Sequence, residues 1–105
     1  MISFIIPTLN EQATIEQTLL GLTAYSGEHE IIVSDGNSID GTVEICRRYT
    51  DTVIVHDEPR RQTIAEARNV GAAAASGDHL VFLDADVLVP DIDDFFRIAE
   101  GVFAA

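Results

Sequence analysis

The sequence predicts an α/β fold, in which an open, Rossmann-like parallel sheet has strands in the spatial order 3-2-1-4 and helices on both faces. Two observations predict it. Short apolar runs alternate with longer segments whose apolar residues recur at helical spacing, in the order β-α-β-α-β-α-β. Each apolar run is also followed by polar residues on a loop that contains Gly or Pro. Such alternation implies parallel strands joined by right-handed crossovers.

Four apolar runs are the expected strands, at residues 2–6, 30–34, 52–56 and 80–83. The last three are short and rich in Ile, Val and Leu, a composition typical of strands buried on both faces. Parallel sheets bind ligands beyond the carboxyl ends of their strands, near the point where the strand order reverses. The order 3-2-1-4 places that point between the first and fourth strands.

Three segments between the strands are the expected helices, and one more helical piece is expected at 94–103. Asn10 can cap the first helix, and Ser38 or Asp40 the second. Thr63 and Glu66 form a T-x-x-E capping box for the third. The apolar stripes of the three segments are Ile15, Leu19 and Leu22; Val43, Cys46 and Tyr49; and Ile64, Ala67, Gly71 and Ala75.

Length and composition predict one domain over residues 1–105 with a genuine core, because the chain has 105 residues of which 47% are hydrophobic. The formal net charge of -12 argues against nucleic acid or an anionic membrane as a partner. A single cysteine and an N-terminus without a basic region predict a cytoplasmic protein. Membrane association in a longer native form stays open.

Two carboxylates, Asp84 and Asp86, interrupt the apolar stretch "FLDADVLVP" at the end of the last expected strand. Side chains two residues apart in an extended chain leave on the same side. Two charges about 6 Å apart repel by roughly 3 kcal/mol at an effective dielectric of about 20. A divalent cation such as Mg²⁺ or Mn²⁺ relieves this repulsion, and it usually brings a substrate phosphate with it.

The residues alone leave a structural role open for this pair, because Asp is common in turns. A second D-x-D, Asp91 to Asp93, follows Pro90 and is interpreted as helix capping. Arginines near the same sheet edge fit phosphate oxygens, but they also offset an acidic surface. These arginines are Arg60, Arg61 and Arg68.

Together these stretches resemble the donor-binding N-terminal half of a family 2 glycosyltransferase with the GT-A fold. The matching segments are "SFIIPTLNEQATIEQTLLGL", "EIIVSDGNSIDGTVEICRRY" and "EARNVGAAAASGDHLVFLDADVLVP". They cover almost the whole chain up to Pro90. The last segment, with A-R-N-x-G before D-A-D, is the most specific.

The resemblance implies that the domain binds a nucleotide-diphosphate sugar, UDP- or GDP-linked, together with Mg²⁺ or Mn²⁺. It implies that Asp86 is the principal metal ligand and that Asp84 lies near the ribose and the metal. The metal would neutralise the departing nucleoside diphosphate. The other residues that the resemblance places at the nucleotide sugar are Pro7, Thr8, Asn10, Glu11, Asp35 and Arg68.

Two departures from the family pattern stand out. Many relatives carry two adjacent acids in the second segment, where this chain has Asp35 followed by Gly36. Family members are also considerably longer, and their later half carries the acceptor site and the catalytic base. We therefore expect a truncated GT-A domain without an assignable base. Its bare sheet surface is expected to promote self-association.

Three functions are compatible with the sequence. The leading one is a metal-dependent glycosyltransferase donor domain, whose acceptor is a polyprenyl phosphate or a saccharide. A non-catalytic nucleotide-sugar-binding or assembly module is the second. A nucleotidyltransferase is the third, although it would be expected to carry a Gly-rich phosphate loop after the first strand, and "PTLNE" has no Gly.

Overall fold

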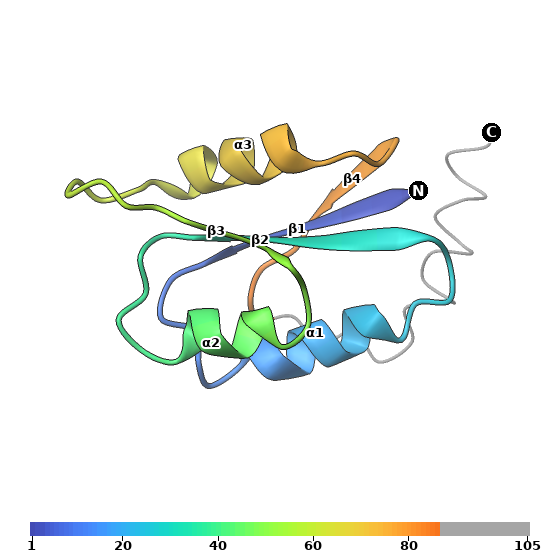
Figure 1. Ribbon diagram of the computed structural model, residues 1–105, viewed down its shortest axis with the longest axis horizontal. Helices are drawn as coiled ribbons and strands as arrows, with labels where there is room; N and C mark the ends of the chain where they lie inside the picture. Colours follow the sequence, from blue (N-terminus) through green and yellow to red (C-terminus); the bar gives the residue numbers. More distant parts are fainter. Residues whose placement is uncertain (87–105) are drawn as a thin grey trace.

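Strands and helices alternate along the computed structural model, which describes residues 1–86 (Figure 1). The elements are β1 Ile2–Thr8, α1 Ile15–Thr23, β2 His29–Asp35, α2 Thr42–Arg47, β3 Thr52–Val55, α3 Ile64–Ala74 and β4 His79–Phe82. The helical piece expected at 94–103 and the second D-x-D lie outside the described residues. None of the helices within residues 1–86 is long and apolar enough to cross a membrane.

The strands form one four-stranded sheet in the order β3-β2-β1-β4. Every pairing is parallel, with Ile2 opposite both His29 and His79, and Ile32 opposite Thr52. The predicted fold class and strand order are therefore confirmed. The carboxyl ends of all four strands meet at one edge of the sheet, as the sequence analysis required.

Helices cover both faces of the sheet, with α1 and α2 on one side and α3 on the other (Figure 1). The main core lies under α1 and α2, because alternate residues of β1 and β2 point to that face. It is closed by the predicted stripe of α1 and by Cys46 of α2. The buried members of this cluster are Ile2, Phe4, Ile6, Ile15, Leu19, Leu22, Ile31, Val33, Cys46 and Ala85.

The opposite layer is thin, because α3 approaches the sheet through its small residues. A Cβ added at Gly71 would lie 2.5 Å from Ile5 Cγ2 of β1 and 3.7 Å from Ser34 Cβ of β2. Ala67, one turn earlier, is 5% exposed. The small residues of the predicted stripe therefore determine how closely α3 packs on the sheet, because no other side chain fits between them.

The outer strands are less buried than the sequence analysis expected. Every residue of β3 is half-buried, and Leu80 and Phe82 of β4 are 43% and 44% exposed. Leu80 pairs with Ser3, and Phe82 pairs with Ile5, on the face that carries α3. Since α3 packs on β1 and β2, it leaves this part of β4 uncovered. The expectation of burial on both faces is wrong for β4 within the described residues.

The predicted N-terminal cap is confirmed for α3 and is wrong for α1. At α3, the Glu66 N–H donates to Thr63 Oγ1 at 3.1 Å, and the Thr63 N–H donates to Glu66 Oε1 at 3.4 Å. At α1 the helix begins after Thr14 without a side-chain cap. Asn10 lies too early in the loop to cap it, and its side chain is used elsewhere. At α2 the N-cap residue is Gly41 and not Ser38 or Asp40, although Asp40 accepts a hydrogen bond from the Thr42 N–H at 3.0 Å.

We expect Gly71→Ala to destabilise the protein, although alanine is the better helix former. The added methyl group would overlap Ile5, which costs about 1–3 kcal/mol, and the gain in helix propensity is about 1 kcal/mol. A urea titration followed by circular dichroism measures the balance. Ala73→Gly on the exposed side of α3 is the matched control and should lose only the propensity contribution. A stabilised Gly71→Ala variant would contradict the close packing.

Candidate functional site

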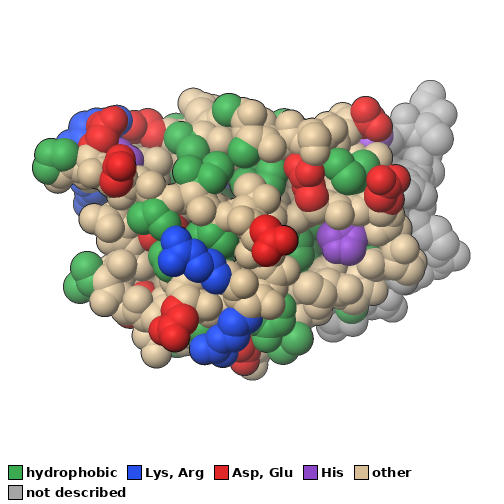
Figure 2. Space-filling model, in the orientation of Figure 1, with side chains coloured by type: hydrophobic (Ala, Val, Ile, Leu, Met, Phe, Trp, Pro, Cys, Tyr) green, Lys and Arg blue, Asp and Glu red, His purple; other side chains and the backbone are tan. Residues whose placement is uncertain are grey.

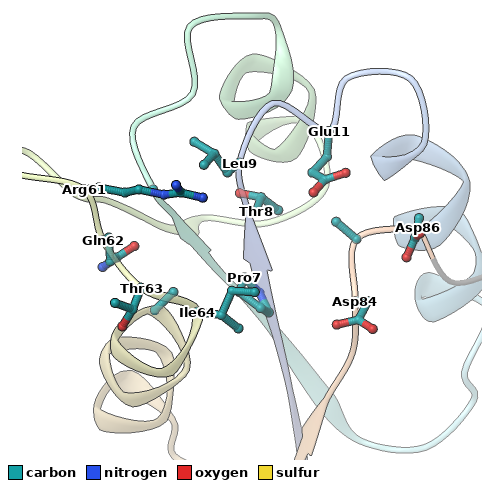
Figure 3. Close-up of a pocket in the computed structure, with 13 residues that line it drawn as sticks. Pro7, Thr8, Leu9, Glu11, Arg61, Gln62, Thr63, Ile64, Asp84 and Asp86 are labelled. Carbon is teal, nitrogen blue, oxygen red and sulfur yellow. The ribbon is translucent and has the colours of Figure 1, made fainter.

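A pocket of about 860 Å³ opens at the carboxyl edge of the sheet, where the loops after all four strands converge (Figure 3). Its two sides differ in charge. Glu11, Asp84 and Asp86 lie on one side, and Arg61, Gln62 and Thr63 lie on the other, with Pro7 and Thr8 between them (Figure 3). The complete lining is Pro7, Thr8, Leu9, Glu11, Gly36, Arg61, Gln62, Thr63, Ile64, Ala67, Asp84, Ala85 and Asp86.

The D-A-D segment is held in place by its middle residue. Ala85 is 3% exposed and belongs to the core, while Asp84 and Asp86 are exposed. The Ala85 carbonyl accepts hydrogen bonds from Thr14 Oγ1 at 3.1 Å and Thr18 Oγ1 at 3.0 Å. Both donors belong to the first turns of α1 and the loop before it. The buried alanine thus fixes the backbone from which the two carboxylates extend to the pocket.

The backbone at this segment is not the extended chain that the sequence analysis assumed. β4 ends at Phe82, and Ala85 and Asp86 lie in a turn. Both carboxylates nevertheless line the same pocket. The turn forms because the Ala85 carbonyl bonds to α1 rather than to a neighbouring strand.

Glu11 shares the negative potential of these two groups. Partial burial, followed by repulsion from Asp86, Asp40 and Asp84, raises the pKa of the Glu11 carboxyl above its ordinary value of 4.5. The acidic side of the pocket therefore carries an excess of negative charge. Oxygen ligands with this charge are the kind that Mg²⁺ and Mn²⁺ prefer.

The acidic residues fit a cation by their chemistry but are not assembled around a point. Within residues 1–86, no three His, Cys, Asp or Glu side chains are grouped closely enough to hold a metal ion. Asp84 is 70% exposed and has the Arg68 guanidinium 3.9 Å from its Oδ1. A metal held here would therefore take a minority of its ligands from residues 1–86, as Mg²⁺ commonly does beside a phosphate.

Asp35 is completely buried beside the pocket, and its carboxylate is fully occupied. Oδ1 accepts from Thr8 Oγ1 and from Ser38 Oγ, each at 2.6 Å. Oδ2 accepts from the backbone N–H groups of Asn37 at 3.0 Å and Ser38 at 2.7 Å. Four donors use the accepting capacity of a carboxylate. The contact between Asp35 and a nucleotide base stays a prediction, and Asp35 is not among the lining residues.

The loop after β1 is tied to the loop after β2 by further hydrogen bonds. The Ile39 N–H donates to Asn10 Oδ1 at 2.9 Å, and the Asn10 N–H donates to Ser38 Oγ at 2.8 Å. The Glu11 N–H donates to Thr42 Oγ1 at 2.8 Å. Asn10 therefore positions the loop that carries Glu11, and its side chain does not line the pocket.

The arginines of the third loop and α3 have different surroundings. Arg60 pairs with Glu58 at 2.9 Å and with Glu66 at 2.6 Å, so it balances charge on the surface. Arg61 lines the pocket. Arg68 lies outside the lining and approaches it only through Asp84.

The structure thus gathers five of the predicted residues and leaves three beside the pocket. Pro7, Thr8, Glu11, Asp84 and Asp86 line it, whereas Asn10, Asp35 and Arg68 do not. Sequence reasoning missed Gln62 altogether. Its position between the third strand and the Thr63 capping box was the available signal, because residues there follow a strand at the ligand edge.

We expect Glu11→Gln to raise the free energy of unfolding of the metal-free protein at pH 7. The raised pKa of Glu11 means that folding opposes its ionised form. The parent therefore loses stability as the pH rises from 4.5 through the higher folded pKa. The difference between variant and parent should vanish below pH 4.5. Urea titrations across this pH range measure it.

The matched control is Glu66→Gln, for which we expect the opposite sign. A hydrogen bond from Arg60 lowers the pKa of Glu66 below 4.5. Its ionised form therefore stabilises the fold at pH 7, and this contribution is lost as the pH falls through the lowered pKa. Equal effects of the two substitutions would contradict the charge distribution described above.

Comparison with known proteins agrees with this architecture. The sequence model of glycosyl transferase family 2 matches residues 3–99. The chain is 38% identical over 94 residues to validoxylamine A glucosyltransferase of Streptomyces hygroscopicus subsp. limoneus, covering 84% of this chain and 21% of that protein. It therefore spans about a fifth of that relative's length.

Two solved structures extend the comparison. Mannosyltransferase PcManGT from Pyrobaculum calidifontis, in complex with GDP-Man and Mn²⁺, superposes with a TM-score of 0.80 at 29% identity, covering 94% of this chain and 31% of that one. Glucosyl-3-phosphoglycerate synthase from Mycobacterium tuberculosis, with Mn²⁺, UDP and glucosyl-3-phosphoglycerate, gives 0.68 at 33% identity, with coverages of 86% and 35%. The α/β sheet with its convergent loops, together with the family match over most of its length, shows that the chain belongs to glycosyl transferase family 2.

Proposed function

We propose that this domain binds the nucleotide-diphosphate sugar of a metal-dependent glycosyltransferase in the pocket at the carboxyl edge of its sheet. The observation that carries the proposal is the convergence of Glu11, Asp84 and Asp86 on one side of that pocket. Two related structures contain Mn²⁺ with GDP-Man or UDP. The donor is therefore proposed to be a UDP- or GDP-sugar, held with Mg²⁺ or Mn²⁺.

The protein's own part in the reaction is to bind and orient the donor. Asp86 and Asp84 would hold the cation, and the loop from Pro7 to Glu11 would border the nucleotide. When bound, the cation would stabilise negative charge on the departing diphosphate. The acceptor, proposed to be a polyprenyl phosphate or a saccharide, and the catalytic base belong to parts of the enzyme beyond the described residues.

Charge on the surface supports a small anionic ligand with a cation rather than a polyanion. On the face drawn in Figure 2, acidic side chains are spread over the described residues, and arginines there form no continuous field. A nucleic acid would require such a field. A nucleoside diphosphate requires only a local cation between its phosphates and the acidic side of the pocket.

Isothermal titration calorimetry with UDP- and GDP-sugars, with and without Mn²⁺, tests the proposal directly. We expect saturable binding of at least one donor that depends on Mn²⁺. Binding of neither donor at any metal concentration would overturn it.

Asp86→Asn should impair metal-dependent binding far more than folding. The substitution keeps the size of the side chain and removes one charge from the acidic side. Mn²⁺-dependent affinity for the nucleotide sugar should fall about tenfold or more, because a charge-assisted ligand is worth at least about 1.4 kcal/mol. The metal-free variant should be as stable as the parent or slightly more stable, since repulsion is relieved.

Asp78→Asn is the control for this substitution. Asp78 pairs with the N-terminal amine at 3.4 Å, at the edge of the sheet opposite the pocket. Its replacement should leave donor affinity unchanged. If the two variants bind alike, or if Asp86→Asn unfolds without losing affinity, the carboxylate pair is structural.

We also propose that the 105-residue chain self-associates through the uncovered face of β4. Leu80 and Phe82 are 43% and 44% exposed there, next to an unpaired strand edge in the described sheet. Sedimentation velocity should show concentration-dependent association that Phe82→Ser reduces. Leu20→Ser removes an equally exposed leucine of α1, at 51%, and should leave association unchanged. A monomer at all concentrations would refute this assembly.

A further inference from the structure

One polar atom in the pocket lacks the partner that its burial demands. Gln62 Oε1 is buried, and no described residue donates a hydrogen bond to it. A buried acceptor without a donor costs free energy, so native structures rarely keep one without a reason. Among the side chains of residues 1–86, Ser34 Oγ is the other such atom, but Ser34 does not line the pocket. A donor supplied by a ligand would satisfy Gln62.

The neighbouring Gly36 leaves room for that ligand. A Cβ added at Gly36 would lie 3.6 Å from Gln62 Oε1, from Leu9 Cδ1 and from the Thr8 carbonyl, which is ordinary van der Waals contact. Gly36 also has no positive φ. Neither packing nor backbone strain therefore requires glycine here. The missing side chain leaves space beside the Gln62 amide.

The proposed cation site determines which end of a nucleotide reaches this amide, although Arg61 also lies on the Gln62 side of the pocket. The acidic residues that would hold a cation, and with it a diphosphate, lie across the pocket from Gln62 (Figure 3). The neutral part of a nucleoside diphosphate is its base. With the diphosphate at the acidic side, the base falls at the side of Leu9 and Gln62.

We propose that Gln62 recognises the nucleobase of the donor by accepting a hydrogen bond from its ring N–H at Oε1. This inference rests on the proposed function and names the base-reading residue of that same pocket. A carboxamide offers one acceptor oxygen and two N–H donors. That set matches a ring N–H beside a carbonyl, which is the edge presented by uracil at N3–H and O4 and by guanine at N1–H and O6.

A chemical double-mutant cycle tests the contact. Calorimetry in Mn²⁺ compares UDP with N3-methyluridine 5′-diphosphate, on the parent chain and on Gln62→Leu. On the parent, methylation of N3 should weaken binding about tenfold, and Gln62→Leu should weaken UDP binding to the same extent. Because both changes remove one hydrogen bond, methylation should cost Gln62→Leu almost nothing further. GDP and N1-methylguanosine 5′-diphosphate form the parallel arm that distinguishes the two bases.

Four controls separate this contact from folding and from the phosphate site. Gln17→Leu, on the exposed surface of α1, should bind UDP like the parent. Mn²⁺-pyrophosphate should bind Gln62→Leu as it binds the parent, since it has no base. Gly36→Asp, added to Gln62→Leu, should restore part of the affinity by placing an acceptor in the open space. Gln62→Glu, which keeps the acceptor, should retain the sensitivity to N3 methylation even if the leucine variant folds poorly.

The possible results distinguish failure of the proposed donor binding from failure of the proposed Gln62 base contact. A parent chain that binds neither UDP nor GDP overturns both. A parent that binds UDP or GDP while Gln62→Leu binds it equally well overturns only the base contact. If Gln62→Leu lost affinity for pyrophosphate and for UDP equally, the diphosphate would lie at Gln62, and the base contact would again be overturned. Additive losses in the cycle would show that the methyl group and Gln62 act at different places.

Discussion

The buried carboxylate of Asp35 is the interaction on which the architecture of the site depends. It sits at the carboxyl end of β2, opposite Thr8 of β1, and accepts hydrogen bonds from the Thr8 hydroxyl and from the turn that follows β2. The turn requires Asn37 to adopt a positive φ of 78°, which asparagine tolerates better than most residues. Without Asp35, the buried hydroxyl of Thr8 and two backbone N–H groups would lose their acceptor.

The two sides of the pocket beside Asp35 are positioned by different helices. The acidic side depends on α1, whose Thr14 and Thr18 hold the Ala85 carbonyl while Asp84 and Asp86 remain free to extend. The opposite side depends on α3, whose close approach at Gly71 places the segment with Arg61 and Gln62 over the sheet edge. Negative charge is therefore concentrated on one side, and Arg61 stands with the neutral amide of Gln62 on the other.

The pair Gly36 and Gln62 illustrates how a departure from a family pattern can be read physically. An acid at position 36 would offer only an acceptor, fixed on the backbone of a partly exposed turn. Glycine at this position instead leaves open space beside an amide that reaches in from another loop. In the proposed base contact, the recognition chemistry lies in the segment before α3 instead of at the end of the second strand. Such a change is invisible in the order of motifs, because the two positions are 26 residues apart in the sequence.

The sequence by itself determined the fold and the edge of the sheet at which the pocket opens. Apolar periodicity, the Thr63 capping box and the small residues of α3 act through local geometry, so they could be read without a structure. Five of the residues singled out from the sequence line one pocket, because parallel strands bring their carboxyl ends together: Pro7, Thr8, Glu11, Asp84 and Asp86.

Only the tertiary structure decided how each polar group is used. Asp35 and Asn10 have side chains that could bind a ligand. Their oxygens instead accept hydrogen bonds from residues of neighbouring strands and loops. Gln62 has no motif of its own, and its importance follows from burial without a donor. β4 shows the same limit, because an apolar run signals burial but does not reveal whether α3 reaches far enough to cover it. Whether a polar group finds hydrogen-bond partners, and whether a strand is covered by a helix, depends on residues distant in the sequence. Patterns of neighbouring residues do not contain this information.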